Sequence, residues 1–103
     1  MNPETDIDTL AAAHPDAVVI DVREPDEYVR GHVPGAVNIP LSQVGARSAE
    51  VPEGTVFVVC ASGNRSKAAT SVLRRAGRDA TSVRGGTAGW QRSGRNVTAG
   101  ARP

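Results

Sequence analysis

The chain has 103 residues, of which 39% are hydrophobic but only 3% aromatic, so we expect one small domain whose core is built from Val, Ile, Leu and Ala. Twelve basic and eleven acidic residues give a formal net charge of +1, which excludes the strong field on which nucleic-acid and membrane-surface binding depend. We therefore expect neither a nucleic acid nor a membrane as a partner.

The chain contains one cysteine, Cys60. A lone thiol forms neither an internal disulfide nor a zinc or redox pair, and it persists in a reducing compartment. The first residues, MNPETDIDTL, lack the basic leader and apolar segment of a signal peptide, and no later apolar run is long enough to span a bilayer. We expect a cytoplasmic protein that needs no metal and no organic cofactor.

The first half of the chain predicts short alternating elements. Asp6 can cap a helix at its start, whereas Pro25 and Gly31 favour the start and stop of another, and Pro40 ends a strand. The apolar run AVVI is typical of a strand that is buried on both faces. The predicted helices cover 7–13, 24–31 and 41–46, and the predicted strands cover 17–20 and 36–39.

The second half holds the best-defined strand and helix. Residues 55–59 are β-branched or aromatic throughout and are bounded by Gly54, which predicts a strand. A helix is expected from 65 or 66 to 76, because its apolar residues fall on one face, and Gly77 can cap its end. A last short strand over 81–83 precedes a flexible GGTAGW turn and a short helix around Trp90, and the tail from about 96 is expected to fray.

Strands that alternate with helices indicate an α/β fold with a mainly parallel central sheet in a single domain over residues 1–103. In such folds ligands bind at the carboxyl ends of the strands. Cys60 directly follows the strand predicted over 55–59, so it marks the candidate active site.

The loop after Cys60 is suited to hold a negative charge. Residues 61–65 must turn the chain sharply if a strand precedes them and a helix follows. Gly63 permits backbone angles that are closed to other residues, and Asn64 tolerates left-handed geometry, so successive amides can point inward. These amides, the dipole of the following helix and Arg65 should lower the pKa of Cys60 and stabilise its nucleophilic thiolate.

The same residues have purely structural interpretations. Cys60 can be a small buried apolar residue that ends a strand. Ser62 and Ser66 can be turn and cap residues, although either hydroxyl could also donate to a bound sulfur or oxyanion. A purely structural Arg65 is less favourable, because a cation in the first turn opposes the helix dipole unless an anion is nearby.

Three segments of the sequence resemble the rhodanese-like domains, which are sulfurtransferases with an α/β fold and a cysteine-centred active loop. These segments are VIDVREPDEYVRGHVPGAVNIPLSQV over 19–44, CASGNRS over 60–66 and GGTAGW over 85–90. They occur in the family's order and cover most of the chain. The resemblance implies a rhodanese-like central sheet of four to five strands flanked by helices.

The resemblance also implies a role for each site residue. Cys60 would be the catalytic residue, which accepts sulfane sulfur as a persulfide. Asp21 and Arg23 would brace the active loop, although a structural role as hydrogen-bonding residues at the end of a strand fits them equally well. His32 would lie in a structural turn, and the alternative is that it acts as a general base. One departure is Ala61, because many active members carry an arginine there and this chain lacks that positive charge. The implied substrate-binding residues are Ala61, Ser62, Gly63, Asn64, Arg65 and Ser66.

The predicted function is that of a rhodanese-type thiosulfate sulfurtransferase. It would move sulfane sulfur from thiosulfate, or from a small or protein persulfide, to a thiol or cyanide acceptor. A persulfide carrier without turnover, or a protein-docking module of the same fold, is the alternative. A cysteine phosphatase is disfavoured, because only ASGN separates Cys60 from Arg65 and this loop is one residue shorter than the phosphatase loop.

Overall fold

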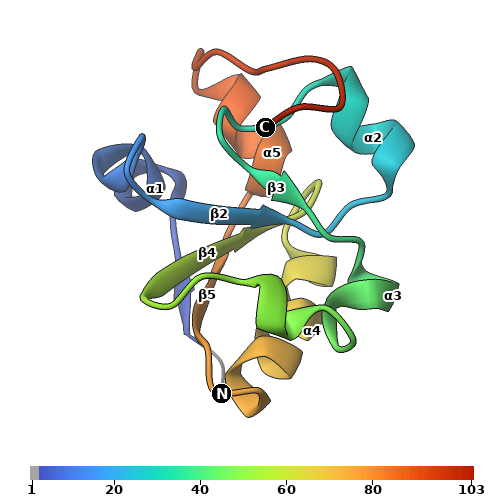
Figure 1. Ribbon diagram of the computed structural model, residues 1–103. Helices are drawn as coiled ribbons and strands as arrows, with labels where there is room; N and C mark the ends of the chain where they lie inside the picture. Colours follow the sequence, from blue (N-terminus) through green and yellow to red (C-terminus); the bar gives the residue numbers. More distant parts are fainter. Residues whose placement is uncertain (1–2) are drawn as a thin grey trace.

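A computed structural model describes residues 3–103 and places a parallel sheet between two layers of helices (Figure 1). The strands are β1 (Glu4–Thr5), β2 (Val18–Asp21), β3 (Val37–Asn38), β4 (Thr55–Val59) and β5 (Asp79–Val83). The helices are α1 (Ile7–Ala13), α2 (Pro25–Arg30), α3 (Leu41–Val44), α4 (Asn64–Arg75) and α5 (Gly86–Arg92), with a 3-10 turn η1 (Ser48–Glu50) before β4. None of the helices between residues 3 and 103 combines the length and apolar character that crossing a membrane requires.

The sheet has the order β1-β5-β4-β2-β3, and all its strands are parallel. β4 is the central strand, with Val58 opposite Ile20 of β2 on one side and opposite Ser82 of β5 on the other. Its burial on both faces explains why its sequence is a continuous apolar run. The predicted α/β fold with four to five mainly parallel strands is confirmed.

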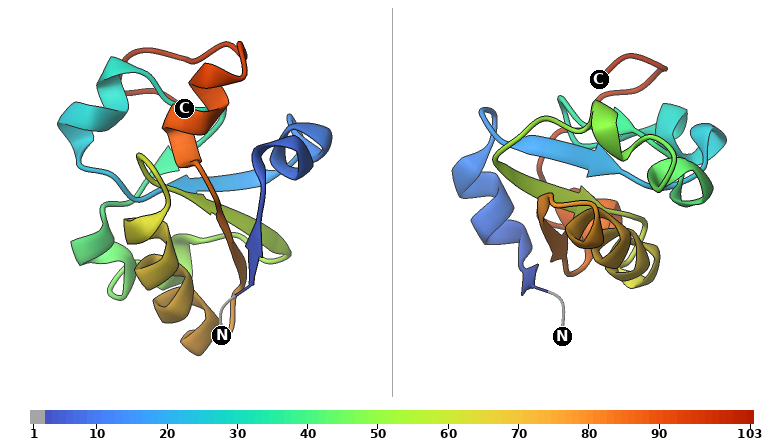
Figure 2. Two further views of the ribbon diagram at one scale, coloured as in Figure 1. Left: turned by 180° about the vertical axis from the view of Figure 1, so that it is seen from behind. Right: turned by 60° about the horizontal axis from the view of Figure 1, so that its bottom comes forward.

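Each face of the sheet carries its own buried core, with α3 and α4 on one face and α1, α2 and α5 on the other (Figure 2). Alternate residues of β4 point to opposite faces, so Val56, Val58 and Cys60 join the α4 side whereas Phe57 and Val59 join the other. The α4-side core also contains Ile20, Val22, Ile39, Val44, Val51, Ala69, Leu73 and Ala80. The opposite core also contains Leu10, Val19, Tyr28, Val33, Ala36, Val83 and Trp90.

Most predicted elements are present, with small shifts at their ends. The Asp6 carboxylate accepts a hydrogen bond from the Thr9 amide at 2.8 Å, as expected of an N-cap. The strand predicted over 17–20 is β2 at Val18–Asp21, and the strand predicted over 81–83 begins earlier as β5. β1 was not predicted, because two residues are too few to show a period. GGTAGW was predicted to be a turn, but it forms the start of α5 from Gly86 onward.

The C-terminal tail runs beside α2 and the turn that follows it (Figure 1). The Gly100 amide donates to the carbonyl of Val29 at 2.8 Å, and the Trp90 indole donates to the carbonyl of Asn96 at 2.7 Å. His32 and Thr98 exchange backbone hydrogen bonds of 2.9 and 2.8 Å. The composition of the tail predicted fraying and gave no sign of these long-range bonds.

Candidate active site

Cys60 lies immediately after β4, at the carboxyl edge of the sheet, and is only 1% exposed. It is a free cysteine whose side chain packs in the α4-side core. The sulfur therefore sits between apolar residues of the sheet and the backbone of the loop that leads into α4. This position alone is compatible with a structural cysteine, so its polar neighbours decide what the thiol can do.

The loop after Cys60 turns its amides toward the sulfur. The Gly63 amide donates to Sγ of Cys60 at 3.0 Å, and Gly63 reaches this geometry with a φ of +123°, in the region that favours glycine. Asn64 does not adopt the left-handed geometry expected of it, since it is the first residue of α4. One glycine is thus enough to close the loop.

The start of α5 holds the outer side of the same loop. The Thr87 amide donates to the Cys60 carbonyl at 2.8 Å, and the Ala88 amide donates to the Ala61 carbonyl at 3.0 Å. A Cβ atom on Gly86 would overlap the carbonyl oxygen of Cys60, so this close approach requires glycine. These hydrogen bonds hold the carbonyls of Cys60 and Ala61 on the α5 side of the loop, while the Gly63 amide faces the sulfur. This role explains the GGTAGW motif, which the sequence did not connect to Cys60.

Ser66 adds a hydroxyl to the surroundings of the sulfur. Its Oγ lies 3.6 Å from Sγ of Cys60 and 2.8 Å from Oγ of Ser82, and it donates to the carbonyl of Gly63 at 3.0 Å. Burial acts to raise the pKa of the Cys60 thiol. Hydrogen bonds from the hydroxyl and amide of Ser66, and from the amides of Gly63 and Ser62, outweigh burial and hold this pKa below its ordinary value.

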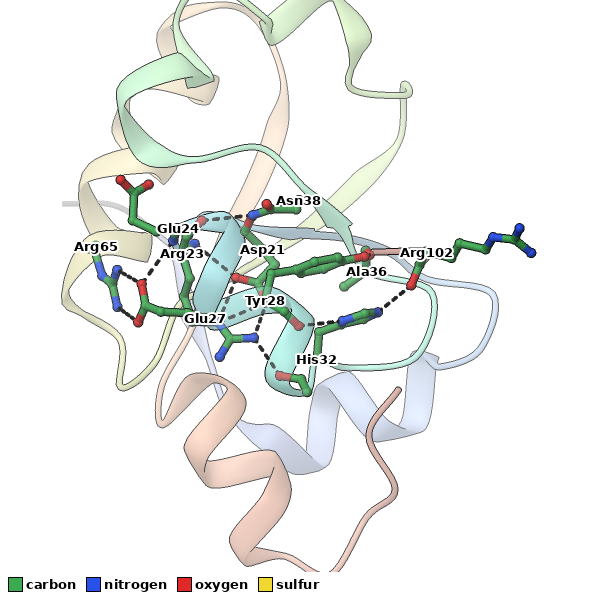
Figure 3. Close-up of polar contacts among 11 residues, drawn as sticks. Asp21, Arg23, Glu24, Glu27, Tyr28, His32, Ala36, Asn38, Arg65 and Arg102 are labelled. Atoms are coloured by element: carbon green, nitrogen blue, oxygen red, sulfur yellow. Dashed lines mark hydrogen bonds and ion pairs between the residues drawn. The ribbon is translucent and has the colours of Figure 1, made fainter. Parts of the chain in front are cut away.

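The guanidinium of Arg65 is bound by a carboxylate. Its Nη1 and Nη2 donate to the two oxygens of Glu27 on α2, at 2.6 and 2.9 Å (Figure 3). These bonds lower the pKa of Glu27 to about 2 and raise the pKa of Arg65. Sequence reasoning assigned Arg65 to an anionic donor and missed Glu27, which lies 38 residues away in the chain. Its only sequence signal is its place in the motif that contains Asp21 and Arg23.

Asp21 and Arg23 form a buried ion pair at the end of β2, 2.8 Å between Nη2 and Oδ2. Nη2 of Arg23 also donates to the carbonyl of Gly31 at 2.8 Å, and this carbonyl follows α2 directly (Figure 3). The pair therefore fixes α2, whose Glu27 in turn holds Arg65 of the active loop. Any bracing of the loop by Asp21 and Arg23 acts through α2.

His32 has structural contacts. Its ring stacks on Tyr28 with centroids 3.7 Å apart, and its Nδ1 and Nε2 lie 2.9 and 2.8 Å from the carbonyl oxygens of Tyr28 and Arg102. These contacts link α2 to the C-terminal tail, as expected for a conformational role. Within residues 3–103 no three His, Cys, Asp or Glu side chains are grouped so that they could hold a metal ion.

A pocket of about 390 Å³ opens beside the active loop. Glu24 and Arg65 are the charged residues of its lining, which Val22, Leu41 and Ser42 complete. Close to Arg65 in the sequence, Ser62 and Asn64 are exposed, whereas Gly63 and Ser66 are buried. With Arg65 bound to Glu27, two carboxylates and one guanidinium lie at or next to this pocket, so its charge is not strongly positive.

Comparison with known proteins identifies the family of the chain. Residues 6–93 match the family model described as the rhodanese-like domain. The chain is 40% identical over 60 residues to the "Putative sulfur carrier protein YrkF" of Bacillus subtilis, covering 57% of this chain and only 32% of that protein. A rhodanese-related protein from Thermoplasma volcanium superposes with a TM-score of 0.87 at 31% identity, covering 92% of this chain and 96% of the other.

A longer solved structure contains the same fold. Thiosulfate sulfurtransferase from Pseudomonas aeruginosa superposes with a TM-score of 0.82 at 31% identity, and the match covers 98% of this chain but 21% of that one. This chain thus spans only about a third of its curated relative YrkF and about a fifth of the Pseudomonas enzyme. The family model nevertheless covers most of the chain, including the Cys60 loop and the start of α5. The chain therefore belongs to the rhodanese-like domain family.

Proposed function

We propose that this protein is a sulfurtransferase that carries sulfane sulfur as a persulfide on Cys60. The observation that supports this most directly is the buried Cys60 sulfur, which receives a hydrogen bond from the Gly63 amide and lies beside the Ser66 hydroxyl. Sulfur transfer is the activity that the family supports. Hydrogen-bond donors grouped around Sγ would also favour the negative charge of a persulfide formed on it.

The proposed reaction has two transfer steps. The Cys60 thiolate attacks the outer sulfur of the donor, the donor's S–S bond breaks, and sulfite leaves if the donor is thiosulfate or a thiolate leaves if it is a persulfide. An acceptor thiolate or cyanide then attacks the outer sulfur on Cys60, which departs as the original thiolate. Each step exchanges one sulfur bond for another, so no external oxidant or reductant is needed.

We propose that a persulfide is a better donor than thiosulfate for this chain. Ala61 supplies no charge at the rim of the site, and the Arg65 guanidinium already binds Glu27 at 2.6 and 2.9 Å. A dianion such as thiosulfate must compete with that carboxylate, whereas a persulfide carries less charge. A small or protein persulfide is therefore the proposed donor class, and a thiol the acceptor. A thiol that must stay free suits the reducing cytoplasm, where we propose that the protein acts.

A persulfide carrier without turnover is the second candidate. It is favoured by the similarity to YrkF, whose printed name describes a sulfur carrier, and by the absence of an arginine at Ala61. In this case Cys60 would load one sulfur and release it only to a specific protein. The two candidates share the persulfide and differ in whether small acceptors discharge it.

Cyanide-dependent release of thiocyanate separates them. We expect the protein to form many equivalents of thiocyanate per Cys60 when it is supplied with a low-molecular-weight persulfide, and less with thiosulfate. The variant C60S should form no more thiocyanate than the donor and cyanide form without protein, with its folding checked by circular dichroism. Release that stops at one equivalent would support the carrier instead. Equal turnover by C60S would contradict both.

A further inference from the structure

A second buried serine, Ser82, lies behind the hydroxyl that contacts Cys60. Ser82 is 1% exposed on β5, and alternation along the strand places it with Ala80 on the α4 side of the sheet. Its Oγ lies 2.8 Å from Oγ of Ser66, although the two residues are 16 positions apart. A polar side chain in this inward position interrupts an otherwise apolar face.

The Ser66 hydroxyl has more hydrogen-bonding neighbours than hydrogens to donate. Its Oγ contacts the Cys60 sulfur at 3.6 Å, the Gly63 carbonyl at 3.0 Å and Oγ of Ser82 at 2.8 Å, but a hydroxyl carries one hydrogen and two lone pairs. When Cys60 is a thiol, its S–H can donate to Ser66, which then donates to the Gly63 carbonyl. When Cys60 loses its proton to solvent, the single hydrogen of Ser66 is needed at the sulfur.

The ionised state leaves one arrangement that satisfies both hydroxyls. If Ser66 donates to the thiolate, its oxygen is left to accept, and Ser82 is the hydroxyl within reach to donate. A hydroxyl that accepts one hydrogen bond is a stronger donor in the next, because buried hydrogen bonds polarise one another. The chain from Ser82 through Ser66 to Cys60 is thus complete only with the thiolate.

We propose that Ser82 is a positioning residue whose hydroxyl donates to Ser66 and so directs the hydrogen of Ser66 to the ionised sulfur of Cys60. The inference goes beyond the proposed sulfur transfer, because it concerns how Cys60 is ionised whichever donor it attacks. The lowered pKa of Cys60, to which the Ser66 hydroxyl contributes, agrees with it.

The charged groups around this chain of hydroxyls have other partners. On the α4 side, Arg65 is the cation coupled electrostatically to Cys60, and its guanidinium is bound by Glu27 of α2. On the neighbouring strand β1, Glu4 is the register partner of Ser82, and its carboxylate pairs with Lys67 of α4 and with Arg84. Removing the Ser82 hydroxyl changes none of these charges.

The test is the pH dependence of Cys60 alkylation by iodoacetamide, which reports the thiolate fraction without any sulfur substrate. For S82A we expect the profile to move to higher pH and the rate below the midpoint to fall about threefold, the effect of losing one neutral hydrogen bond. S82T, which keeps the hydroxyl, should restore the profile. T70V is the matched control, because Thr70 of α4 is buried and its hydroxyl has no hydrogen-bond partner.

A double-mutant cycle tests whether Ser82 acts through Ser66. We expect S66A to slow alkylation more than S82A, and S66A/S82A to match S66A alone. An unmoved profile in S82A, additive effects in the double variant, or an equal shift in T70V would overturn the proposal. If S82A does not fold, the isosteric pair S82T and S82V provides the same comparison. Because alkylation needs no sulfur donor, failure of sulfur transfer leaves this test intact.

Discussion

The Cys60 sulfur is surrounded by neutral hydrogen-bond donors. The amide of Gly63 and the hydroxyl of Ser66 contact it, and they act against the burial that would raise its pKa. Arg65 lies in the first turn of α4, but both its terminal nitrogens are bound by Glu27. The site can therefore stabilise an anionic sulfur without offering a free guanidinium to a dianionic donor. Glu27 is the residue that keeps the Arg65 guanidinium from such a donor.

Replacing Glu27 with glutamine should release Arg65 toward the active loop. We expect E27Q to raise kcat/KM for thiosulfate relative to a persulfide by about twofold to fivefold, the range of a partly exposed ion pair. The matched control is D26N, which removes the same charge from α2 at an exposed position 3.7 Å from Arg30. Equal gains in E27Q and D26N would show that the change in net charge alone causes the effect. No gain in E27Q would contradict the idea that Glu27 keeps Arg65 from thiosulfate.

At the scale of elements, α5 determines the orientation of the active loop. Its first amides bind the carbonyls of Cys60 and Ala61, and this requires Gly86 to approach the end of β4 closely. Gly86 also has a φ of +53°, which other residues adopt at a cost. The helix thus connects the end of β5 to the loop after β4. Its first turn belongs to the site through these backbone hydrogen bonds.

Substitution of Gly86 by alanine should disturb both stability and reactivity. We expect G86A to lower the free energy of unfolding by about 2 kcal/mol or more, because its Cβ would overlap the Cys60 carbonyl. G94A is the control, since Gly94 also has a positive φ of +83° but no atom within 4 Å of the added Cβ. It should cost only about 1 kcal/mol.

Urea unfolding measures both variants, and iodoacetamide alkylation reports the loop. We expect slower alkylation at neutral pH in G86A and an unchanged rate in G94A. Equal losses of stability in the two variants would show that backbone strain alone matters at Gly86. A normal alkylation rate in a destabilised G86A variant would show that α5 does not determine the reactivity of Cys60 in the active loop.

For the whole molecule, the parallel sheet brings distant segments to one edge. β4 delivers Cys60, while α2, α4 and α5 all begin at the carboxyl ends of their preceding strands, on the two faces of the sheet (Figure 2). Asp21 and Arg23 fix the end of α2, which carries Glu27. Three helices therefore meet the active loop: α4 directly, α5 through its amides and α2 through an ion pair.

The parts of this arrangement that were predicted are local in sequence. Residues 55–59 form β4 as expected, since a run of β-branched and aromatic residues bounded by Gly54 strongly favours a strand. The position of Cys60 after that strand and the turn at Gly63 follow from the same short segment. The direction of the Cys60 pKa shift was also expected, although the hydrogen bonds from Ser66, Gly63 and Ser62, rather than Arg65, are the largest causes that lower it.

The parts that were missed depend on contacts between distant segments. Glu27 meets Arg65, and Ser82 meets Ser66, only because the sheet order places their elements together. Neither the periodicity nor the composition of the sequence indicates that these residues are in contact. Gly86 was visible in the GGTAGW motif, but a glycine pair is equally typical of a flexible turn. Its close approach to Cys60 becomes evident only when β4 and β5 are paired.

Intact-protein mass spectrometry tests the persulfide on Cys60 most directly. After incubation of the reduced protein with thiosulfate or a low-molecular-weight persulfide, we predict a mass increase of one sulfur atom, more complete with the persulfide. Cyanide should remove the added sulfur, and C60S should not acquire it. A folded protein that gains no sulfur from either donor, or an adduct that persists in C60S, would contradict the assignment of Cys60 as the sulfur carrier.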